Sequence, residues 1–352
     1  MGCSPSRKSA DPEQAVLQLR GGEDSKESKG GPVQLKARII LECNNLLGEA
    51  PLWHEGKGKL YWLDINGKML WEYSPSVCSG GSCTMPSHKS WPLPEVAGSF
   101  AFSKDGKKFL MGFASGLAWW DPEKPNESVR VCEYEQGLNT RPNDGKCDRQ
   151  GNFVIGSYNN NHREDKLNIA GLWRLNAKDS SLTEILDYRF RCSNTIAFSP
   201  SGDEIYFCDT PTKAIYKFKY TPDGPLTGRT LFYQMGEEEA GGPDGATVDA
   251  AGGLWEAQAG NWKVVRHRPA DGAVDYEVVL PCNNPTSCAI GGDTLYITTA
   301  RHRLTEEQRK AQPGAGQLWA VELPPSIRGL PEPVFAASRR RREHAAPRPL
   351  TG

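Results

Sequence analysis

Short runs of β-branched and aromatic residues recur along the middle of the chain, separated by turns rich in Gly, Asn, Asp and Pro. Each unit is an apolar strand, a turn, a second apolar strand, another turn and a third strand, with a period of roughly 45 to 50 residues, close to propeller-blade spacing. The first strands of the units cover residues 50–54, 99–102, 145–148, 195–198, 246–249 and 287–290. Six such units predict an all-β, six-bladed β-propeller with four-stranded blades.

The long period also separates this fold from its main alternative, a β-sandwich. In a sandwich the turn signals come about every 8 to 12 residues and do not group into longer units. No segment has the period of a long amphipathic helix. In a propeller the innermost strands of all blades surround one channel, so residues at the start of those strands are candidates for a site. A further strand within residues 35–43 is expected to complete the last blade and close the ring.

The two ends of the chain lack the repeat. We expect the propeller to span residues 35–335, between a disordered N-terminal tail (residues 1–34) and a basic disordered C-terminal tail (residues 336–352). The N-terminus matches the M-G-x-x-x-[ST] acylation pattern at Gly2, and Cys3 beside it is a candidate for palmitoylation. Two acyl chains would anchor the protein stably, whereas one alone binds a membrane weakly. A tail without acylation is the alternative, and the sequence leaves both open.

Composition narrows the classes of partner. Lys and Arg total 42 against 43 Asp and Glu, so the protein has no excess positive charge that would attract nucleic acid. A small neutral or weakly charged ligand fits this balance better. No apolar run approaches the ~18 residues of a spanning helix. We therefore expect a cytoplasmic monomer that acts on a small molecule, tethered to the inner membrane face if the N-terminus is acylated.

The ten cysteines are scattered from Cys3 to Cys288, and no secretory signal precedes them. Most are therefore expected to be reduced and buried. Cys78 and Cys83 flank a Ser-Gly-Gly-Ser loop, where a small bridge is sterically conceivable, but two free thiols in a flexible insertion are expected. Zinc is excluded there because no second Cys or His pair completes a tetrahedral set.

Four polar residues stand just before innermost strands, where an apolar blade has no packing use for them. They are Glu49, Asn143, Asn194 and Asp244. If each projects into the channel, Glu49, Asn194 and Asp244 place two carboxylates and an amide oxygen around one centre. Such oxygen ligands suit Ca²⁺ and tolerate Mg²⁺ or Mn²⁺.

A purely structural interpretation competes with this one. Asn-Asp-Gly and Pro-Asp-Gly are ordinary turn tripeptides, in which Asn or Asp caps its own backbone. Asp148 and Asp249, inside the repeats, are expected to be structural carboxylates of this kind. Similar motifs at corresponding positions of separate blades nevertheless favour a site that these residues share.

Several short sequence motifs together resemble those of the SMP-30/gluconolactonase/LRE-like family, and the resemblance covers roughly residues 40 to 335. They are Gly-Glu-Ala-Pro-Leu-Trp (48–53), Arg-Pro-Asn-Asp-Gly-Lys (141–146), Ser-Asn-Thr (193–195), Pro-Asp-Gly (243–245) and Thr-Ser-Cys (286–288). The resemblance implies a six-bladed propeller with one divalent metal held by Glu49, Asn194 and Asp244. It also implies that Arg141 and Asn143 contact the substrate and that Asp244 transfers a proton.

The activity implied is metal-dependent hydrolysis of a sugar lactone, with Ca²⁺ as the first choice of metal and Zn²⁺, Mn²⁺ or Mg²⁺ as alternatives. Two other functions stay open: hydrolysis of an aryl ester or phosphotriester at the same metal, and a non-catalytic calcium-binding regulatory propeller. The sequence departs from the family at one place. Members that carry an acidic substrate contact have it shortly after the Asn-Asp-Gly-Lys motif, where this chain has Ser-Tyr-Asn-Asn-Asn-His (157–162). The sequence therefore leaves the choice of substrate open.

Overall fold

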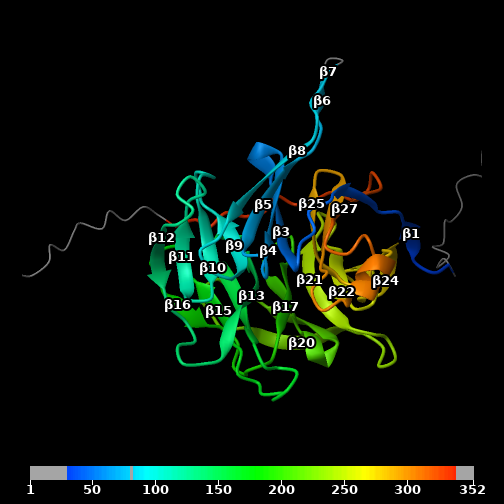
Figure 1. Cartoon of the computed structure of the whole chain (residues 1–352). Coiled ribbons are helices and arrows are strands. Elements are labelled where there is room, and N and C mark those ends of the chain that lie inside the picture. The colour runs from blue at the N-terminus through cyan, green and yellow to red at the C-terminus, as the bar shows by residue number, and fades with distance from the viewer. Residues whose placement is uncertain (1–29, 80–81, 338–352) are drawn as a thin grey trace, which may run out of the picture. The chain divides into compact units, whose positions relative to one another are not determined.

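The structure is a computed structural model that describes residues 30–79 and 82–337. From Pro32 onward these residues form one compact unit built almost entirely of strands (Figure 1). Gly2, Cys3 and the run of four arginines at 339–342 lie outside the described residues.

Six sheets form the ring, and each adds its strands outward from the channel in chain order, except that the N-terminal strands β1 and β2 join the outer edges of blades five and six. Blade one holds β3 (Gly48–His54), β4 (Lys59–Asp64), β5 (Met69–Ser74) and β8 (Ser87–Pro92). Blade two holds β9 (Ala97–Phe102), β10 (Phe109–Phe113), β11 (Gly116–Trp120) and β12 (Ser128–Cys132). Blade three holds β13 (Thr140–Cys147), β14 (Phe153–Asn159), β15 (Leu172–Leu175) and β16 (Leu182–Glu184).

The second half of the ring repeats this order. Blade four holds β17 (Ser193–Phe198), β18 (Glu204–Asp209), β19 (Ala214–Lys219) and β20 (Thr227–Gln234). Blade five holds β21 (Gly242–Val248), β22 (Leu254–Ala259), β23 (Lys263–His267), β24 (Val274–Val279) and the added β1 (Val33–Leu35). Blade six holds β25 (Pro285–Gly291), β26 (Thr294–Thr299), β27 (Leu318–Glu322) and β2 (Arg38–Leu41). The prediction of a six-bladed propeller is confirmed.

Helix is confined to short connections. The 3-10 turn η1 (Glu55–Lys57) lies between β3 and β4, and the 3-10 turn η2 (Thr210–Thr212) lies between β18 and β19. The helix α1 (Glu306–Ala311) lies between β26 and β27. Thr305 begins α1 with a capping box, in which its hydroxyl accepts from the Gln308 backbone N–H at 3.2 Å. Within the part of the chain that the structure describes, no helix has the length and apolar character needed to cross a membrane.

The apolar residues of the repeats pack between blades. Six buried clusters occur in the described part of the chain, and each joins two neighbouring blades of the ring. Trp62 of blade one, 0% exposed, packs with blade six, and Trp255 of blade five, also 0% exposed, packs with blade six on its other side. Burying a large apolar side chain is worth ~1.5–3 kcal/mol, so these clusters hold the innermost strands in fixed relative positions.

The ring closes as expected, through the N-terminal strand β2. β2 pairs antiparallel with β27, with Arg38 opposite Ala320, and so completes blade six. On the channel side, the Thr286 hydroxyl of blade six donates to the Gly48 carbonyl of blade one at 2.5 Å. One pairing was not expected: β1 adds to the outer edge of blade five in parallel with β24.

The segment after β27 lies across the end of the channel where the innermost strands finish. Gly329 forms a bridge with Asp249 of blade five, and the Phe335 N–H donates to the Phe102 carbonyl of blade two at 2.9 Å. Between them, Glu332 approaches Lys146 of blade three at 3.7 Å. Residues at the strand starts, including the candidate site, therefore face the opposite end of the channel.

The loop between Cys78 and Cys83 corrects one expectation. β6 (Cys78–Ser79) and β7 (Ser82–Cys83) form a hairpin that projects from blade one in Figure 1, with Cys78 opposite Cys83. Cys83 is disulfide-bonded, so the expectation of two free thiols is wrong. The β-pairing of the two positions brings their backbones close enough for a bridge, which the sequence spacing alone did not decide. Seven other cysteines in the described residues are free, and five of them are buried.

Candidate active site

A bulge near the start of the innermost strand marks each of the four candidate positions. The pairing register shifts between Glu49 and Leu52 in β3, and between Asn194 and Ala197 in β17. β13 and β21 shift in the same way, at Pro142/Gly145 and Pro243/Ala246. A bulge bends its strand and redirects a side chain, which explains how polar residues at these positions face the channel rather than a blade interface.

Two of the bulges hold residues in the left-handed backbone region. Ala50, directly after Glu49, has a φ of 49°, and Thr195, directly after Asn194, has a φ of 58°. This conformation is uncommon for residues other than glycine and is strained for a β-branched one such as Thr. The hydroxyl of Thr195 donates to the Asp244 carbonyl at 2.8 Å, which ties the strained turn of blade four to the candidate residue of blade five.

Hydrogen bonds connect the candidate residues from blade to blade. Arg141 donates from Nη1 to the Asn143 Oδ1 at 2.8 Å, and Asn143 Nδ2 donates to the Asn194 Oδ1 at 3.1 Å. Asn194 Nδ2 in turn donates to the Thr210 hydroxyl at 2.7 Å. That hydroxyl donates to the Pro243 carbonyl at 2.8 Å. The structure therefore brings Arg141, Asn143 and Asn194 together and links them to the strand that carries Asp244.

The carboxylates of the site repel one another. Burial raises the pKa of Glu49 well above its ordinary value, and the charges of Asp244 and Asp144 raise it further. The pKa of Asp244 is raised in the same way, by burial first and then by Asp144 and Glu256. Burial raises the pKa of Asp144 to about 6, although Lys146 and the backbone N–H of Ile196 oppose the shift. Among the described residues, none of Glu49, Asp144 and Asp244 forms an ion pair.

This donor set fits a hard divalent cation. Two mutually repelling carboxylates on separate blades gain most from a shared positive charge, and the Asn194 amide supplies a neutral oxygen of the same kind. In the described chain, no three His, Cys, Asp or Glu side chains are grouped closely enough to hold a metal on their own. The candidate set therefore depends on Asn194 as its third protein ligand.

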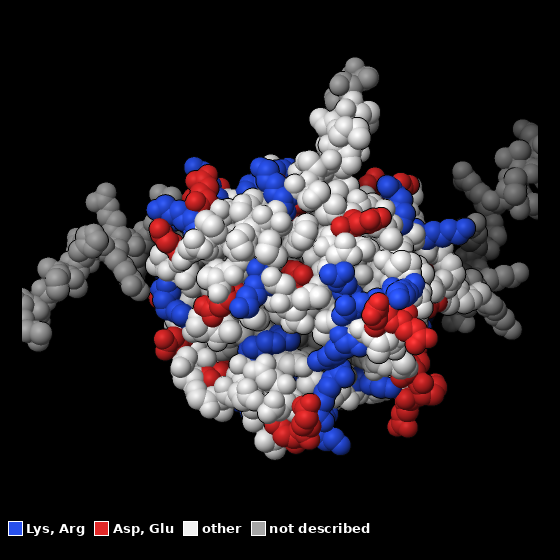
Figure 2. Space-filling model, viewed as in Figure 1, with Lys and Arg blue, Asp and Glu red and all other residues white. Residues whose placement is uncertain are grey.

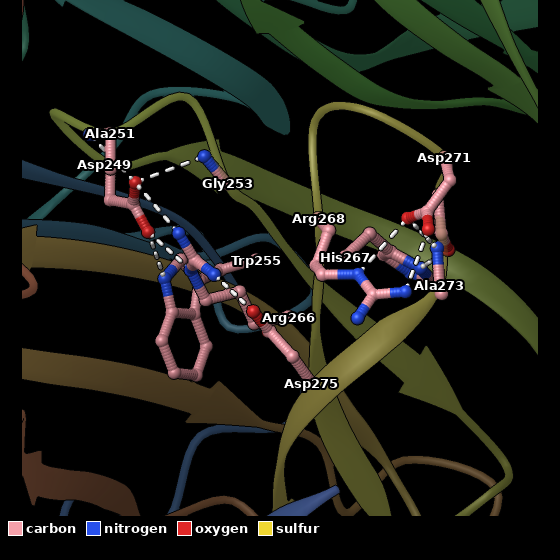
Figure 3. A network of polar contacts seen from close by, with 11 residues as sticks. Asp249, Ala251, Gly253, Trp255, Arg266, His267, Arg268, Asp271, Ala273 and Asp275 are labelled. Atoms are coloured by element: carbon pink, nitrogen blue, oxygen red, sulfur yellow. Dashed lines mark hydrogen bonds and ion pairs between the residues drawn. The ribbon is translucent and has the colours of Figure 1, made fainter. Parts of the chain in front are cut away.

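Carboxylates elsewhere in the repeats behave differently, as Figure 3 shows for blade five. Asp249 is 0% exposed and accepts from Trp255 Nε1 at 3.0 Å and from Arg266 Nε at 2.6 Å. Arg266 also pairs with Asp275 at 2.6 Å. Asp148 is likewise buried and accepts from the Tyr220 hydroxyl at 2.6 Å. Both were expected to be structural, and their full sets of partners support that interpretation.

Three residues of the site were not singled out from the sequence. Asp144 follows Asn143 directly, and its position inside the bulge of β13 lets two successive residues reach the channel. Thr210 lies in η2, in a loop with no motif. Tyr158, at the end of β14, lies under Arg141, whose guanidinium carbon is 4.2 Å from the ring centre. Only Asp144 had a sequence signal, its place in the Asn-Asp-Gly turn.

A cavity of about 310 Å³ adjoins Arg141. Its other walls come from the end of β12 and from the loop before β13, including Arg130, Tyr134 and Glu135. This volume lies at the lower end of the range for small-molecule sites. The buried hydroxyl of Tyr134 has no hydrogen-bond partner in the described part of the chain.

Fold and site together define a six-bladed propeller with a polar, oxygen-rich site at one mouth of its central channel. The model of the SMP-30/Gluconolactonase/LRE-like region matches residues 47–301, and the chain belongs to that family.

Three similar proteins illustrate the family. The L-arabinolactonase of Azospirillum brasilense is 35% identical over 288 residues, which cover 82% of this chain and 92% of the relative. The 6-deoxy-6-sulfogluconolactonase of Pseudomonas putida is 32% identical over 303 residues, 85% of this chain and 98% of that one. Among solved structures, the calcium-binding protein regucalcin from Agrobacterium tumefaciens superposes with a TM-score of 0.75 at 24% identity, covering 87% of this chain and 99% of the other.

Proposed function

We propose that this protein hydrolyses a sugar lactone with the help of one divalent cation held at the channel mouth. The observation that carries the proposal is the electrostatic coupling of Glu49 and Asp244 beside the linked side chains of Asn194, Asn143 and Arg141. Neither carboxylate has an ion-pair partner among the described residues. Membership of the family and the lactonase activities in the names of its relatives support the same reaction class.

The residue roles follow from their chemistry. Glu49, Asn194 and Asp244 would hold the cation, Ca²⁺ as the first choice and Zn²⁺, Mn²⁺ or Mg²⁺ as alternatives. When bound, a divalent cation supplies Lewis-acid polarisation of the lactone carbonyl and neutralises the developing oxyanion. Arg141, fixed by Asn143 and by the Tyr158 ring, offers N–H donors to ring hydroxyls. Asp244 would accept a proton from the attacking water and return it to the leaving alkoxide.

The surroundings of Glu49, Asp244 and Asn143 affect their protonation and orientation. Desolvation raises the pKa of both Glu49 and Asp244, so each carboxylate holds a proton more readily than it would in water. Asn143 keeps its amide nitrogen toward blade four, where it donates to the Ser193 carbonyl at 2.8 Å as well as to Asn194. This fixed amide nitrogen holds the Asn194 side-chain oxygen in place.

The proposal is tested with purified, EDTA-stripped protein. Hydrolysis of glucono-1,5-lactone and of L-arabinono-1,4-lactone is followed by acid release while Ca²⁺, Mg²⁺, Mn²⁺ and Zn²⁺ are restored one at a time. Turnover that returns with a metal supports both the ion site and the lactonase activity. Calorimetric binding of the ion without turnover of either lactone would overturn the lactonase assignment and leave a binding protein. Aryl ester and phosphotriester substrates form a parallel panel, and activity on those alone would move the reaction to another bond.

A further inference from the structure

Loops from two opposite blades meet over the candidate site. Residues 160–171 connect β14 to β15 in blade three, and residues 300–317 connect β26 to β27 in blade six. Arg303 of the blade-six loop reaches blade three, where its Nη2 donates to the Tyr158 hydroxyl at 3.5 Å. Tyr158 also contacts His162, at 4.8 Å between ring centres, and Arg141 on its face. The Tyr158 side chain therefore contacts basic side chains from three separate segments of the chain.

The blade-six loop is held in place rather than free to swing. The backbone N–H groups of Arg301 and His302 both donate to the Leu46 carbonyl, at 3.1 and 2.8 Å. Arg303, next in the chain, has a φ of 66°, in the left-handed region that a non-glycine residue adopts only when its surroundings impose it. Arg303 is therefore presented toward Tyr158 by a fixed backbone.

The basic groups are crowded together at this rim. Burial lowers the pKa of His302 to about 4, with Arg303, Arg141 and Arg163 lowering it further. Burial also lowers the pKa of His162, again with contributions from the charges of Arg163, Arg303 and Arg191. Each imidazole therefore lies within the field of three guanidinium groups, and the two sets share Arg163 and Arg303.

Within the described residues these arginines form no close ion pair, although the charge of Arg141 acts on Glu49 and Asp244 and that of Arg191 on Asp209. Among the residues that the structure describes, none of Arg141, Arg163, Arg191, Arg301 and Arg303 makes an ion pair with Asp or Glu within 4.0 Å. Glu164, which opposes the shift of His162, is exposed. Among the described residues, the buried atoms His302 Nδ1 and Arg301 Nε have no hydrogen-bond partner, so both can bind a ligand.

The concentration of charge is local. The whole chain has a formal net charge of −1, and Figure 2 shows acidic and basic side chains interspersed over one face of the molecule. A cluster of like charges costs free energy in the absence of a counter-ion, and in a concave site it focuses the field on an approaching anion. Guanidinium groups in particular bind carboxylate, phosphate and sulfonate oxygens through paired N–H donors.

We propose that the substrate of this protein is a sugar lactone that carries an anionic group on the carbon remote from its carbonyl, bound at the rim by Arg303, Arg163 and His302. This inference rests on the proposed function, because it assumes that the lactone ring lies at Arg141 and Asn143. A small ligand fits better than an anionic polymer, because Arg303 and Arg141 both contact the single Tyr158 side chain, and Arg141 is also part of the candidate site.

Binding is tested first, without reliance on turnover. Isothermal calorimetry on the full chain compares sorbitol with sorbitol 6-phosphate, which differ only in the phosphate, and with inorganic phosphate at the same ionic strength. Sorbitol 6-phosphate is expected to bind about tenfold or more tighter than either, because a charge-assisted contact to guanidinium is added to the polyol contacts. Equal affinity for sorbitol and its phosphate overturns the proposal. Inorganic phosphate binding as tightly as the sugar phosphate also overturns it, since the site would then recognise an isolated anion.

The variants separate the rim from general charge effects. Arg303→Gln is expected to remove most of the tenfold preference. Lys310→Gln is the matched control, because it removes one positive charge from the same loop, but a charge already paired with Glu306 at 3.3 Å. A preference that survives in both Arg303→Gln and Arg163→Gln overturns the proposal. Tight binding of DNA or of anionic vesicles that competes with sorbitol 6-phosphate would also overturn it, in favour of a polymer or membrane surface.

A kinetic arm distinguishes failure of this inference from failure of the proposed function. The ratio of kcat/KM for 6-phosphoglucono-1,5-lactone over glucono-1,5-lactone is expected to be about tenfold or more. A ratio near one with clear turnover of both lactones overturns the anionic substrate and leaves the lactonase intact. Selective binding of sorbitol 6-phosphate with no turnover of either lactone supports anion recognition at the rim and overturns the lactonase.

Discussion

The guanidinium of Arg141 donates to the side-chain oxygen of Asn143 at 2.8 Å, and this bond decides which way the Asn143 amide faces. With its oxygen occupied, Asn143 turns its nitrogen toward blade four, where it donates to the Asn194 oxygen at 3.1 Å. A substrate-binding residue and a candidate metal ligand on neighbouring blades are thus positioned by one another. The consequences of this arrangement can be measured.

Arg141→Lys is expected to raise KM for the lactone about tenfold or more with little loss of stability. A lysine ammonium cannot contact the Asn143 oxygen, the Pro142 carbonyl and the Tyr158 ring together, as the planar guanidinium does. Steady-state kinetics give KM, and thermal unfolding checks the fold. Lys213→Arg, at a lysine that binds backbone carbonyls near the same end of blade four, serves as a control with no expected change.

Glu49→Gln is expected to abolish metal binding and turnover and yet to stabilise the metal-free protein by about 1 kcal/mol, because an unpaired carboxylate beside Asp244 is removed. Asp244→Asn should behave in the same way. Calorimetry with Ca²⁺ and denaturant unfolding in EDTA measure the two effects separately. Retained activity in both variants would exclude these residues as the metal site.

Asp249→Asn is the matched contrast, and the opposite sign is expected. Asp249 is paired with Arg266 at 2.6 Å, and removing one member of a buried pair costs ~3–5 kcal/mol. Denaturant unfolding should show a large loss of stability. A neutral or stabilising result would mean that the partners in Figure 3 do not distinguish structural carboxylates from those of the site.

The metal-free protein should lose stability from Asp144 as the pH rises. Its pKa is raised from 3.8 to about 6 on folding, so its favourable contribution is complete below pH 3.8 and is lost as the pH passes about 6. The difference in unfolding free energy between wild type and Asp144→Asn should therefore change by on the order of 3 kcal/mol over this window. Urea unfolding in EDTA at several pH values measures it, and a flat difference would contradict the assignment.

Non-reducing peptide mapping by mass spectrometry should find Cys83 bridged, with Cys78, its partner in register, as the expected second half. Cys83→Ser should shift Tm by only a few degrees at most, because the β6–β7 hairpin closes a short loop and lies outside the blade-to-blade clusters. Recovery of free Cys83 from unreduced protein would contradict the bridge.

Acylation at Gly2 and Cys3 stays a prediction, because both residues lie outside the described residues. Expressed in a eukaryotic cell, the full chain should partition partly to membranes, and Gly2→Ala should release it, since palmitoylation at Cys3 follows myristoylation at Gly2. Equal soluble fractions for both forms would favour a plain tail. The domain limits at residues 35 and 335 also stay predictions.

The sequence by itself determined the architecture and the likeness of its site to a known family. Strand periodicity depends on local alternation of apolar residues, so the sequence alone predicted the six blades and the closing strand within residues 35–43. It also showed that Glu49, Asn194 and Asp244 recur in register with the repeat. Local alternation says which face of a strand is buried.

Only the tertiary structure decided which side chains meet across the ring. The bulges that turn Glu49 and Asn194 into the channel depend on pairing with the neighbouring strand, and the contact from Arg303 to Tyr158 joins residues 145 positions apart on opposite blades. Such contacts are set by ring closure and by the packing of each blade against the next, and no local pattern records them.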